Sequence, residues 1–196
     1  MTRYDDTAAG FETDPDRGPW TQSRTGRFYP LDPRPEEVSA EAIIHSLAQV
    51  NRFGGHADEP ISVAQHSMQC ALMAYRDGVS LPEQYALLMH DAAEAYVGDM
   101  QRPLKSTLIE FKRIEWKIFA AIKVALEIPD CDPVLIKYYD NKSWMWEKRD
   151  LFTTSEDPWP HTPDIPLPSE TMQVMDWKTA KRLMTDIYSA YREILG

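Results

Sequence analysis

The stretch ALLMHDAAEAYVGD, residues 86–99, predicts a helix that carries charged side chains although its other residues are mostly apolar. Glu94 follows His90 by four residues and Asp91 by three, so the three side chains lie on neighbouring strips of that helix. A charged group on a core-facing helix is costly unless something compensates for it. For a buried carboxylate beside an imidazole, the best compensation is a divalent cation. The stretch therefore predicts a metal site on a buried helix.

One helix cannot supply a complete set of metal ligands, so neighbouring helices must contribute. His66 lies one turn into the helix expected from VAQHSMQCALMAYRDG, whose N-cap is Ser62. Asp140 lies on a helix expected at about 133–151. Alternatives to Asp140 on or near that helix are Asp130, Asp132 and Asp150. With the His-Asp pair of the first stretch, these nitrogen and oxygen ligands suit one divalent metal ion, whether Mn, Co, Fe, Ni, Zn or Mg.

The remainder of the chain also predicts helices. Apolar residues recur at helical spacing, Gly78 and Gly98 end two of the helices, and Glu83 lies at capping-box distance from Ser80. No segment alternates with period two for long, and no internal repeat occurs. Further helices are expected at about 43–53, 80–98, 106–126 and 176–195. The sequence therefore predicts an all-α fold, a compact single-domain bundle of about six main helices.

Two segments fall outside this helical pattern. Residues 1–35 are rich in Gly, Pro, Asp and Thr, and they predict an extended N-terminal arm laid over a helical domain of residues 36–196. The segment EDPWPHTPDIPLP, within a loop at about 156–170, has too many prolines for a helix or a central strand. Neither segment carries a functional motif, so we expect the chemistry to lie between them.

Length and composition exclude several classes of protein. The 196 residues, 43% apolar and 27% charged, are those of one globular domain, and no apolar run is long enough to span a membrane. The N-terminus is polar and acidic, and Cys70 and Cys131 form no CxxC pair, which favours two buried, reduced thiols in a cytoplasmic protein. The net charge of −10 argues against binding a nucleic-acid polymer but permits a small anionic substrate.

Three motifs occur in a fixed order: SVAQHS at 62–67, LLMHDAAEAYVGDMQRPLK at 87–105 and YYDNKSWMWEKRDL at 138–151. This series, with Glu and Gly-Asp following the His-Asp pair, resembles the HD-domain metal-dependent phosphohydrolases over about residues 38–155. The small branch that includes bacterial 5'-deoxynucleotidases is the most similar. The resemblance implies an HD-type helical bundle and an enzyme that cleaves the phosphomonoester of a small nucleotide, most of all a 5'-deoxynucleoside monophosphate.

The resemblance also implies roles for individual residues. The metal would be bound by the four residues that match the family's ligands: His66, His90, Asp91 and Asp140. Glu94 would be the acid/base partner of the attacking water, and Asp99 would contact the substrate. Arg52 and Phe53 would contact the phosphate and the sugar, although Phe53 stands where the family has Trp. The loop GGHADEP that follows also departs from the family, and its His56 would either contact the substrate or order the loop.

The residue types suit hydrolysis of a phosphate ester. A divalent ion activates water and neutralises charge on a phosphoryl oxygen. An apolar helix face would raise the pKa of Glu94 and favour proton transfer near neutral pH. The chain lacks the His-His pair that adds a second metal in some HD enzymes, so the resemblance implies one metal ion.

Other functions fit the same motifs. A deoxynucleoside triphosphate triphosphohydrolase would use the same ligands, and a pocket with cations beyond Arg52 would favour it; a phosphodiesterase is a third possibility. A non-catalytic HD module would bind a metal or a nucleotide without turnover, although the intact Glu94 argues against that function. In each case the partner is a small-molecule nucleotide, with no nucleic-acid polymer and no membrane. Apolar surface on the arm and on the aromatic-rich helices favours a homodimer.

Overall fold

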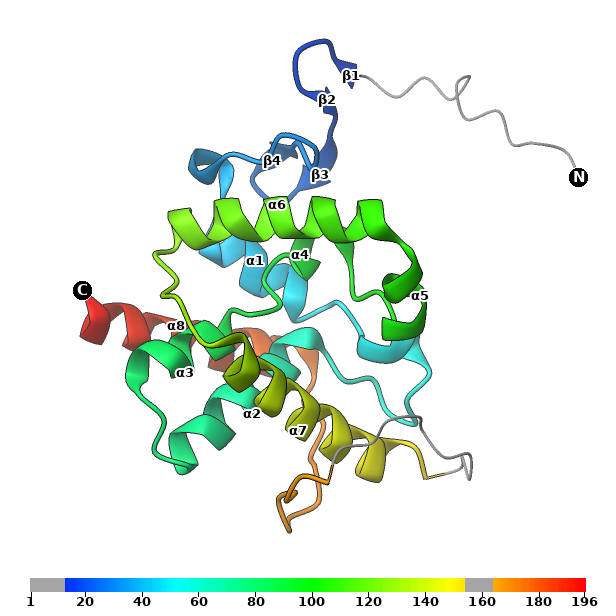
Figure 1. Cartoon of the computed structure of the whole chain (residues 1–196), viewed down its shortest axis with the longest axis vertical. Helices are drawn as coiled ribbons and strands as arrows, with labels where there is room; N and C mark the ends of the chain where they lie inside the picture. The colour runs from blue at the N-terminus through cyan, green and yellow to red at the C-terminus, as the bar shows by residue number, and fades with distance from the viewer. Residues whose placement is uncertain (1–12, 154–163) are drawn as a thin grey trace, which may run out of the picture.

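The computed structural model describes residues 13–153 and 164–196 of the chain (Figure 1). Within these residues the chain is mostly helical, as expected. The helices are α1 (Ala40–Leu47), α2 (Val63–Arg76), α3 (Leu81–Leu88), α4 (Glu94–Val97), α5 (Arg102–Thr107), α6 (Ile109–Ala125), α7 (Pro133–Leu151) and α8 (Trp177–Leu195). None of these helices combines the length and the apolar character that crossing a membrane requires.

The N-terminal arm differs from expectation because it contains small antiparallel hairpins. The paired strands are β1 (Thr13–Asp14) with β2 (Gly18–Pro19), and β3 (Thr21–Ser23) with β4 (Gly26–Phe28). The all-α prediction is therefore only roughly right. One side chain of this segment contacts the helices: the buried Phe28 ring stacks on Tyr96 of α4, with the ring centroids 3.7 Å apart.

The stretch at 86–99 was predicted to be part of one continuous helix, and that prediction is wrong. A tight turn, residues 89–93, separates α3 from α4. Its backbone hydrogen bonds join residues three apart, as when the Glu94 N–H donates to the Asp91 carbonyl at 2.9 Å. Apolar side chains on either side of the His-Asp pair are fully buried and hold the turn in place: Met89 and Ala92. The His-Asp pair therefore lies in a buried turn where the helical ladder is interrupted.

Other expected helix limits are corrected or confirmed. The helix expected at 106–126 is divided at Leu108 into α5 and α6, and the helix expected at 43–53 is the shorter α1. The Ser80 hydroxyl donates to a glutamate carboxylate at 2.6 Å and does not cap α3. Ser62 does cap α2, because its hydroxyl accepts a hydrogen bond from the Gln65 N–H at 3.2 Å. The limits of α7 and α8 agree with expectation to within one residue. The proline-rich loop lies partly outside the described residues.

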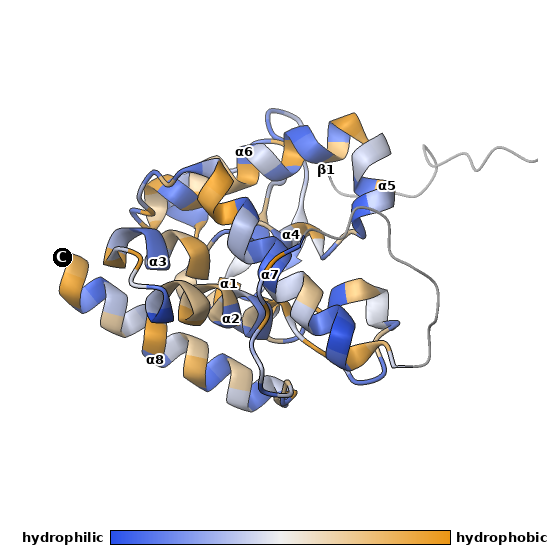
Figure 2. Cartoon of the chain, turned by 60° about the horizontal axis from the view of Figure 1, so that its bottom comes forward, coloured by the Kyte–Doolittle hydropathy of each residue, from blue (hydrophilic) through white to orange (hydrophobic). Residues whose placement is uncertain are grey.

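Helix α2 lies at the centre of the fold. Most of its residues are buried, and it packs against α3, α7 and α8. The main hydrophobic core joins α1, α2, α3, α6 and α8, while a second cluster fills the space between α2 and α7. Figure 2 shows apolar and polar residues alternating along α8, the pattern of an amphipathic helix packed on a core. Because α2 contacts both α3 and α7, polar side chains from all three helices can meet.

Candidate metal centre

The four side chains expected to bind metal converge where α2, α7 and the α3–α4 turn meet. The Nε2 atom of His66 lies 3.6 Å from Asp91 Oδ2 and 3.5 Å from Asp140 Oδ1. The same Asp91 oxygen lies 3.2 Å from His90 Nε2. Neighbouring ligands of one ion lie about 3–4 Å apart when each metal–ligand bond is about 2.0–2.3 Å. The three measured distances therefore have the spacing of neighbouring ligands of one ion.

Hydrogen bonds to the other ring nitrogen orient both imidazoles. His66 Nδ1 donates to Glu147 Oε1 at 2.6 Å, and His90 Nδ1 donates to the Leu87 carbonyl at 2.7 Å. Each bond leaves Nε2 facing the carboxylates, the arrangement that commonly supports a metal-ligating histidine. His90 Nε2 is buried and has no hydrogen-bond partner among the described residues. Because a buried nitrogen without a partner is costly, the donor set fits a divalent ion.

Attraction between opposite charges controls protonation in this cluster. Burial lowers the pKa of His90, but the Asp91 carboxylate outweighs burial and raises the pKa to about 9. Burial also raises the pKa of Asp91 and of Asp140, yet the neighbouring histidines hold both pKa values below their usual range. These directions show that the carboxylates attract positive charge at this point, which a bound cation would also supply.

Glu147 accepts hydrogen bonds from both His66 and Arg52 and so orients them, a role that was not predicted from the sequence. It is fully buried on α7, where Oε1 accepts from His66 at 2.6 Å and from the Ser143 hydroxyl at 3.1 Å. Its Oε2 accepts from Arg52 Nε at 2.8 Å. The signal was present in the sequence, because Glu147 follows Asp140 by seven residues and so lies on the same face of a helix.

Arg52, expected to contact phosphate, lies at the edge of the cluster. It is buried, and its NH1 atom lies 3.9 Å from Asp91 Oδ2. Burial disfavours the charged guanidinium, but the carboxylates of Glu147 and Asp99 outweigh that effect and keep the pKa of Arg52 above its usual range. The site therefore holds a permanent positive charge next to the expected metal ligands.

Glu94, the expected acid/base group, is buried at the start of α4 with 5% of its surface exposed. Its Oε1 lies 3.7 Å from Lys105 Nζ, and its Oε2 has no hydrogen-bond partner among the described residues. Burial, with the charges of Asp91 and Asp99, raises the pKa of Glu94 well above its usual value. This is the direction expected from its apolar surroundings.

Phe53 and Asp99, two further residues expected at the substrate site, contact each other at the turn Arg52–Gly55. Phe53 has a φ of 58°, which is uncommon for a residue other than glycine, and its N–H donates to Asp99 Oδ2 at 3.2 Å. Burial raises the pKa of Asp99. Asp99 thus holds this turn against the centre, a structural contact in addition to its expected role. His56 is exposed, and within the described ranges no contact joins its side chain to the cluster.

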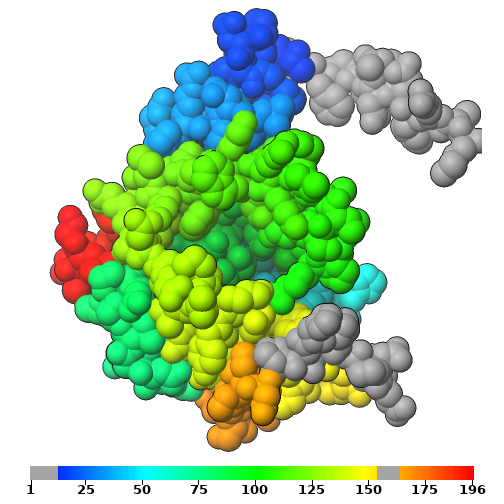
Figure 3. All heavy atoms as spheres, in the orientation of Figure 1, coloured from blue at the N-terminus to red at the C-terminus, as the bar shows by residue number. Residues whose placement is uncertain are grey.

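A cavity of about 320 Å³ opens beside the cluster. Its lining combines His90, Asp91 and Glu94 with side chains near or on α6: Lys105, Lys112, Glu115, Trp116 and Phe119. Figure 3 shows the recess, framed by α5, α6 and the start of α7. Its volume lies at the lower end of the usual range for small-molecule pockets, about 300–1,000 Å³. Lys105 and Lys112 lie among the lining carboxylates, and Lys105 Nζ is paired with Glu115 at 2.6 Å, so the lining carries charges of both signs.

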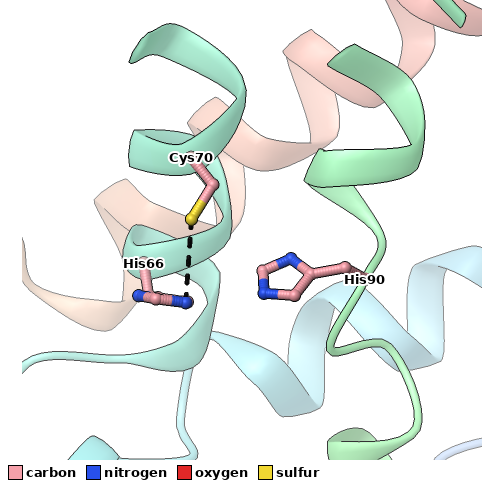
Figure 4. A group of neighbouring side chains, drawn as sticks. All are labelled: His66, Cys70 and His90. Carbon is pink, nitrogen blue, oxygen red and sulfur yellow. Dashed lines mark hydrogen bonds between the residues drawn. The ribbon is translucent and has the colours of Figure 1, made fainter. Parts of the chain in front are cut away.

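Cys70 brings a sulfur atom to the same cluster. Its Sγ lies 3.7 Å from His66 Nε2, and ligand atoms of His66, Cys70 and His90 all lie within 4.8 Å of one another (Figure 4). These three residues form a possible metal-binding group. Sequence reasoning treated Cys70 only as a buried thiol, although its position one helical turn after His66 was a signal. Cys131 is half-buried, not buried as expected, and both cysteines are free thiols.

Comparisons with known proteins identify relatives of unknown function. No family model matches the chain. The chain is 32% identical over 124 residues to an uncharacterized protein of Rhodobacter capsulatus, an alignment that covers 60% of this chain and 63% of that protein. It is 35% identical over 133 residues to the uncharacterized protein YfdR of Escherichia coli K12, covering 67% of this chain and 71% of YfdR. The chain therefore belongs to the same protein family as YfdR.

Proposed function

We propose that the protein is a metal-dependent phosphohydrolase of the HD-domain kind, which releases phosphate from a small nucleotide, most of all a 5'-deoxynucleoside monophosphate. One observation carries the proposal. The Nε2 atoms of the buried His66 and the half-buried His90 lie 3.2–3.6 Å from two carboxylates, next to the buried Glu94. Ligands for a divalent ion, an acid/base group and the neighbouring Arg52 cation are together what transfer of a phosphoryl group to water requires.

In the proposed reaction, the water oxygen forms a bond to phosphorus and the bond from phosphorus to the 5' oxygen of the sugar breaks. A divalent ion held by the four ligands would supply an activated water and neutralise charge on a phosphoryl oxygen. Glu94 moves the protons. Its carboxyl group, whose pKa is raised by burial, holds a proton that it donates to the departing 5' oxygen, and it regains one from the attacking water.

Arg52 binds the phosphate in this proposal. Its Nε is held by Glu147 at 2.8 Å, whereas NH1 lies beyond hydrogen-bond distance from Asp91, at 3.9 Å. A planar guanidinium can donate two parallel hydrogen bonds to a phosphate group, which a lysine cannot do. Because Glu147 holds both Arg52 and His66, one carboxylate positions the phosphate-binding group relative to the metal ligands.

The experiment is an assay of phosphate release from nucleoside mono-, di- and triphosphates, each with Mn²⁺, Co²⁺, Zn²⁺ or Mg²⁺ and without metal. We expect phosphate release from deoxynucleoside monophosphates that requires added metal. Glu94→Gln should lower kcat by about 10²–10⁴-fold with metal content unchanged. Glu110→Gln, at an exposed position on α6, is the matched control and should leave kcat unchanged. Equal turnover by Glu94→Gln would refute the acid/base role of Glu94. Binding of metal and nucleotide without metal-dependent release from any nucleotide would refute the proposal and favour a non-catalytic binding module.

A second candidate, a deoxynucleoside triphosphate triphosphohydrolase, is favoured by cations beyond Arg52. Lys105 and Lys112 line the cavity. Arg102 and Lys137 each donate to Asp140 Oδ2 at 2.9 Å. These cations could bind a longer phosphate chain. The products distinguish the two candidates, because the second releases tripolyphosphate and the first releases phosphate, each together with a nucleoside.

A further inference from the structure

We infer that Cys70 is an additional metal ligand, whose thiolate makes the site selective for a thiophilic ion such as Zn²⁺ over Mg²⁺. The inference rests on the metal centre of the proposed function and names a ligand that the expected set of two histidines and two aspartates does not contain. It also predicts which ion that centre prefers.

The position of the sulfur atom supports this assignment. Cys70 follows His66 by four residues on α2, so both side chains project from the same face of the helix. Figure 4 shows the thiol and the two imidazoles directed toward a common space between α2 and the α3–α4 turn. With a Zn–S bond of about 2.3 Å and a Zn–N bond of about 2.0–2.1 Å, two ligand atoms of one zinc ion lie at most about 4.4 Å apart. The observed separation of Cys70 Sγ from His66 Nε2 is 3.7 Å.

A second observation points to a ligand in that space. His90 belongs to the same group of ligand atoms within 4.8 Å, and its buried Nε2 makes no hydrogen bond among the described residues, because its contact with Asp91 Oδ2 at 3.2 Å lacks hydrogen-bond geometry. A thiol buried among apolar side chains is ordinarily a small apolar filler. Cys70 is fully buried, but its sulfur lies beside the very nitrogen of His66 that faces the carboxylates. Its hydrogen bond to the Tyr139 carbonyl, at 3.5 Å, is a weak one to give up.

The charges around the site offset an extra anionic ligand. Two carboxylates and a thiolate would carry one negative charge more than a divalent ion neutralises. Arg52 NH1 lies 3.9 Å from Asp91 Oδ2, and Arg102 and Lys137 both contact Asp140 Oδ2. As the metal–sulfur bond forms, the S–H bond breaks and its proton passes to bulk water, so no oxidant or reductant is needed. A thiolate ligand favours Zn²⁺ and Co²⁺, whereas Mg²⁺ prefers oxygen ligands alone.

The test uses the full chain freed of metal and loaded with one equivalent of Co²⁺. We expect a near-ultraviolet sulfur-to-cobalt charge-transfer band that persists in Cys131→Ser and disappears in Cys70→Ser and Cys70→Ala. Because the chain has two cysteines, the band in Cys131→Ser identifies Cys70 even if the Cys70 variants fail to fold. Affinity for Zn²⁺ should fall about 10–100-fold in Cys70→Ala, with affinity for Mg²⁺ unchanged.

The outcomes separate this inference from the proposed function. If cobalt binds and activates hydrolysis but neither the wild type nor Cys131→Ser shows the band, Cys70 is not a ligand and the hydrolase proposal stands. A band that survives in a folded Cys70→Ser protein also overturns the inference. If the wild type binds neither Co²⁺ nor Zn²⁺, the inference fails, and the proposed function fails with it only when Mn²⁺ and Mg²⁺ also support no phosphate release.

Discussion

Two arginines in this molecule each lie between carboxylates, and they differ in how completely their surroundings are satisfied. Arg17, in the N-terminal arm, donates to Asp32 Oδ2 at 2.6 Å, to both carboxylate oxygens of Glu37, and to the Asp32 carbonyl at 2.7 Å. Its guanidinium also lies 3.8 Å from the centre of the Tyr29 ring. Every nitrogen of that guanidinium has a partner, and the result is an ion cluster that fastens the arm to the residues that follow it.

Arg52 is more deeply buried, yet its neighbours are incompletely paired. Around it, His90 Nε2 and Glu94 Oε2 are both buried without a hydrogen-bond partner among the described residues. Proteins rarely leave such groups unpaired in a purely structural cluster. The cluster around Arg17, in which every guanidinium nitrogen has a partner, stabilises the fold. The cluster around Arg52, which contains buried polar atoms without a hydrogen bond, has the features of a ligand-binding site.

The largest expected effect is on the free energy of unfolding, when the carboxylate that pairs with each arginine is removed. Glu147→Ala should lower the free energy of unfolding by about 3–5 kcal/mol, because it leaves the buried Arg52 without its nearest carboxylate. Glu37→Ala, the matched change beside Arg17, should cost less because water reaches that cluster. Urea denaturation of both variants measures the difference. Equal losses would show that burial does not distinguish the two clusters.

The next effect concerns metal binding. Zn²⁺ at about one hundred times its Kd should raise the free energy of unfolding of the wild type by about 2.7 kcal/mol. The same rise should occur in Arg17→Ala and disappear in His90→Ala, because only the second change removes an expected ligand. Thermal unfolding with and without Zn²⁺ measures it. A stabilisation that survives in His90→Ala would place the ion elsewhere.

A conservative change at each arginine sharpens the comparison. Arg52→Lys keeps the charge opposite Glu147 but cannot donate two parallel hydrogen bonds to phosphate. We expect kcat/KM to fall about tenfold, which corresponds to about 1.4 kcal/mol. Arg17→Lys should leave kcat/KM unchanged. Steady-state kinetics on the best substrate from the assay above measure kcat/KM for both variants. An equal fall in kcat/KM in Arg52→Lys and Arg17→Lys would contradict phosphate binding by Arg52.

The smallest effect is a pH dependence in the arm. The hydrogen bond from Arg17, helped by Arg34, holds the pKa of Asp32 below its usual value. A lowered pKa in the folded state adds stability above the unfolded pKa of about 3.9, and that stability is lost as the pH falls through the folded value. Wild type should therefore exceed Asp32→Asn in melting temperature at neutral pH by a margin that shrinks below about pH 4. A margin that stays constant with pH would contradict this.

The sequence predicted the parts of the site that depend on local pattern. The expected positions of α7 and α8 and the Ser62 cap agree with the structure because periodicity and capping act within a few residues. The break between α3 and α4 was missed because the helical pattern continues through it, and only packing of the turn interrupts the helix. The hairpins of the arm were missed because strands of two or three residues are too short to show alternation.

The contacts that organise the centre depend on the arrangement of the helices. Glu147 holds His66 and Arg52 only because α7 packs against α2, which no spacing along the chain reveals. Cys70 is likewise a candidate ligand only because the His90 ring, on the α3–α4 turn, lies close to its sulfur atom. Sequence patterns predict which residue types could bind a metal, and the tertiary packing determines which of them meet.

X-ray diffraction at a zinc absorption edge, on crystals grown with Zn²⁺, would locate the bound ion. We predict one anomalous peak between α2, α7 and the α3–α4 turn, about 2.0–2.2 Å from the Nε2 atoms of His66 and His90 and from a carboxylate oxygen of Asp91. A peak bound only by residues elsewhere on the molecule, or a fully ordered cluster with no peak among these side chains, would contradict it.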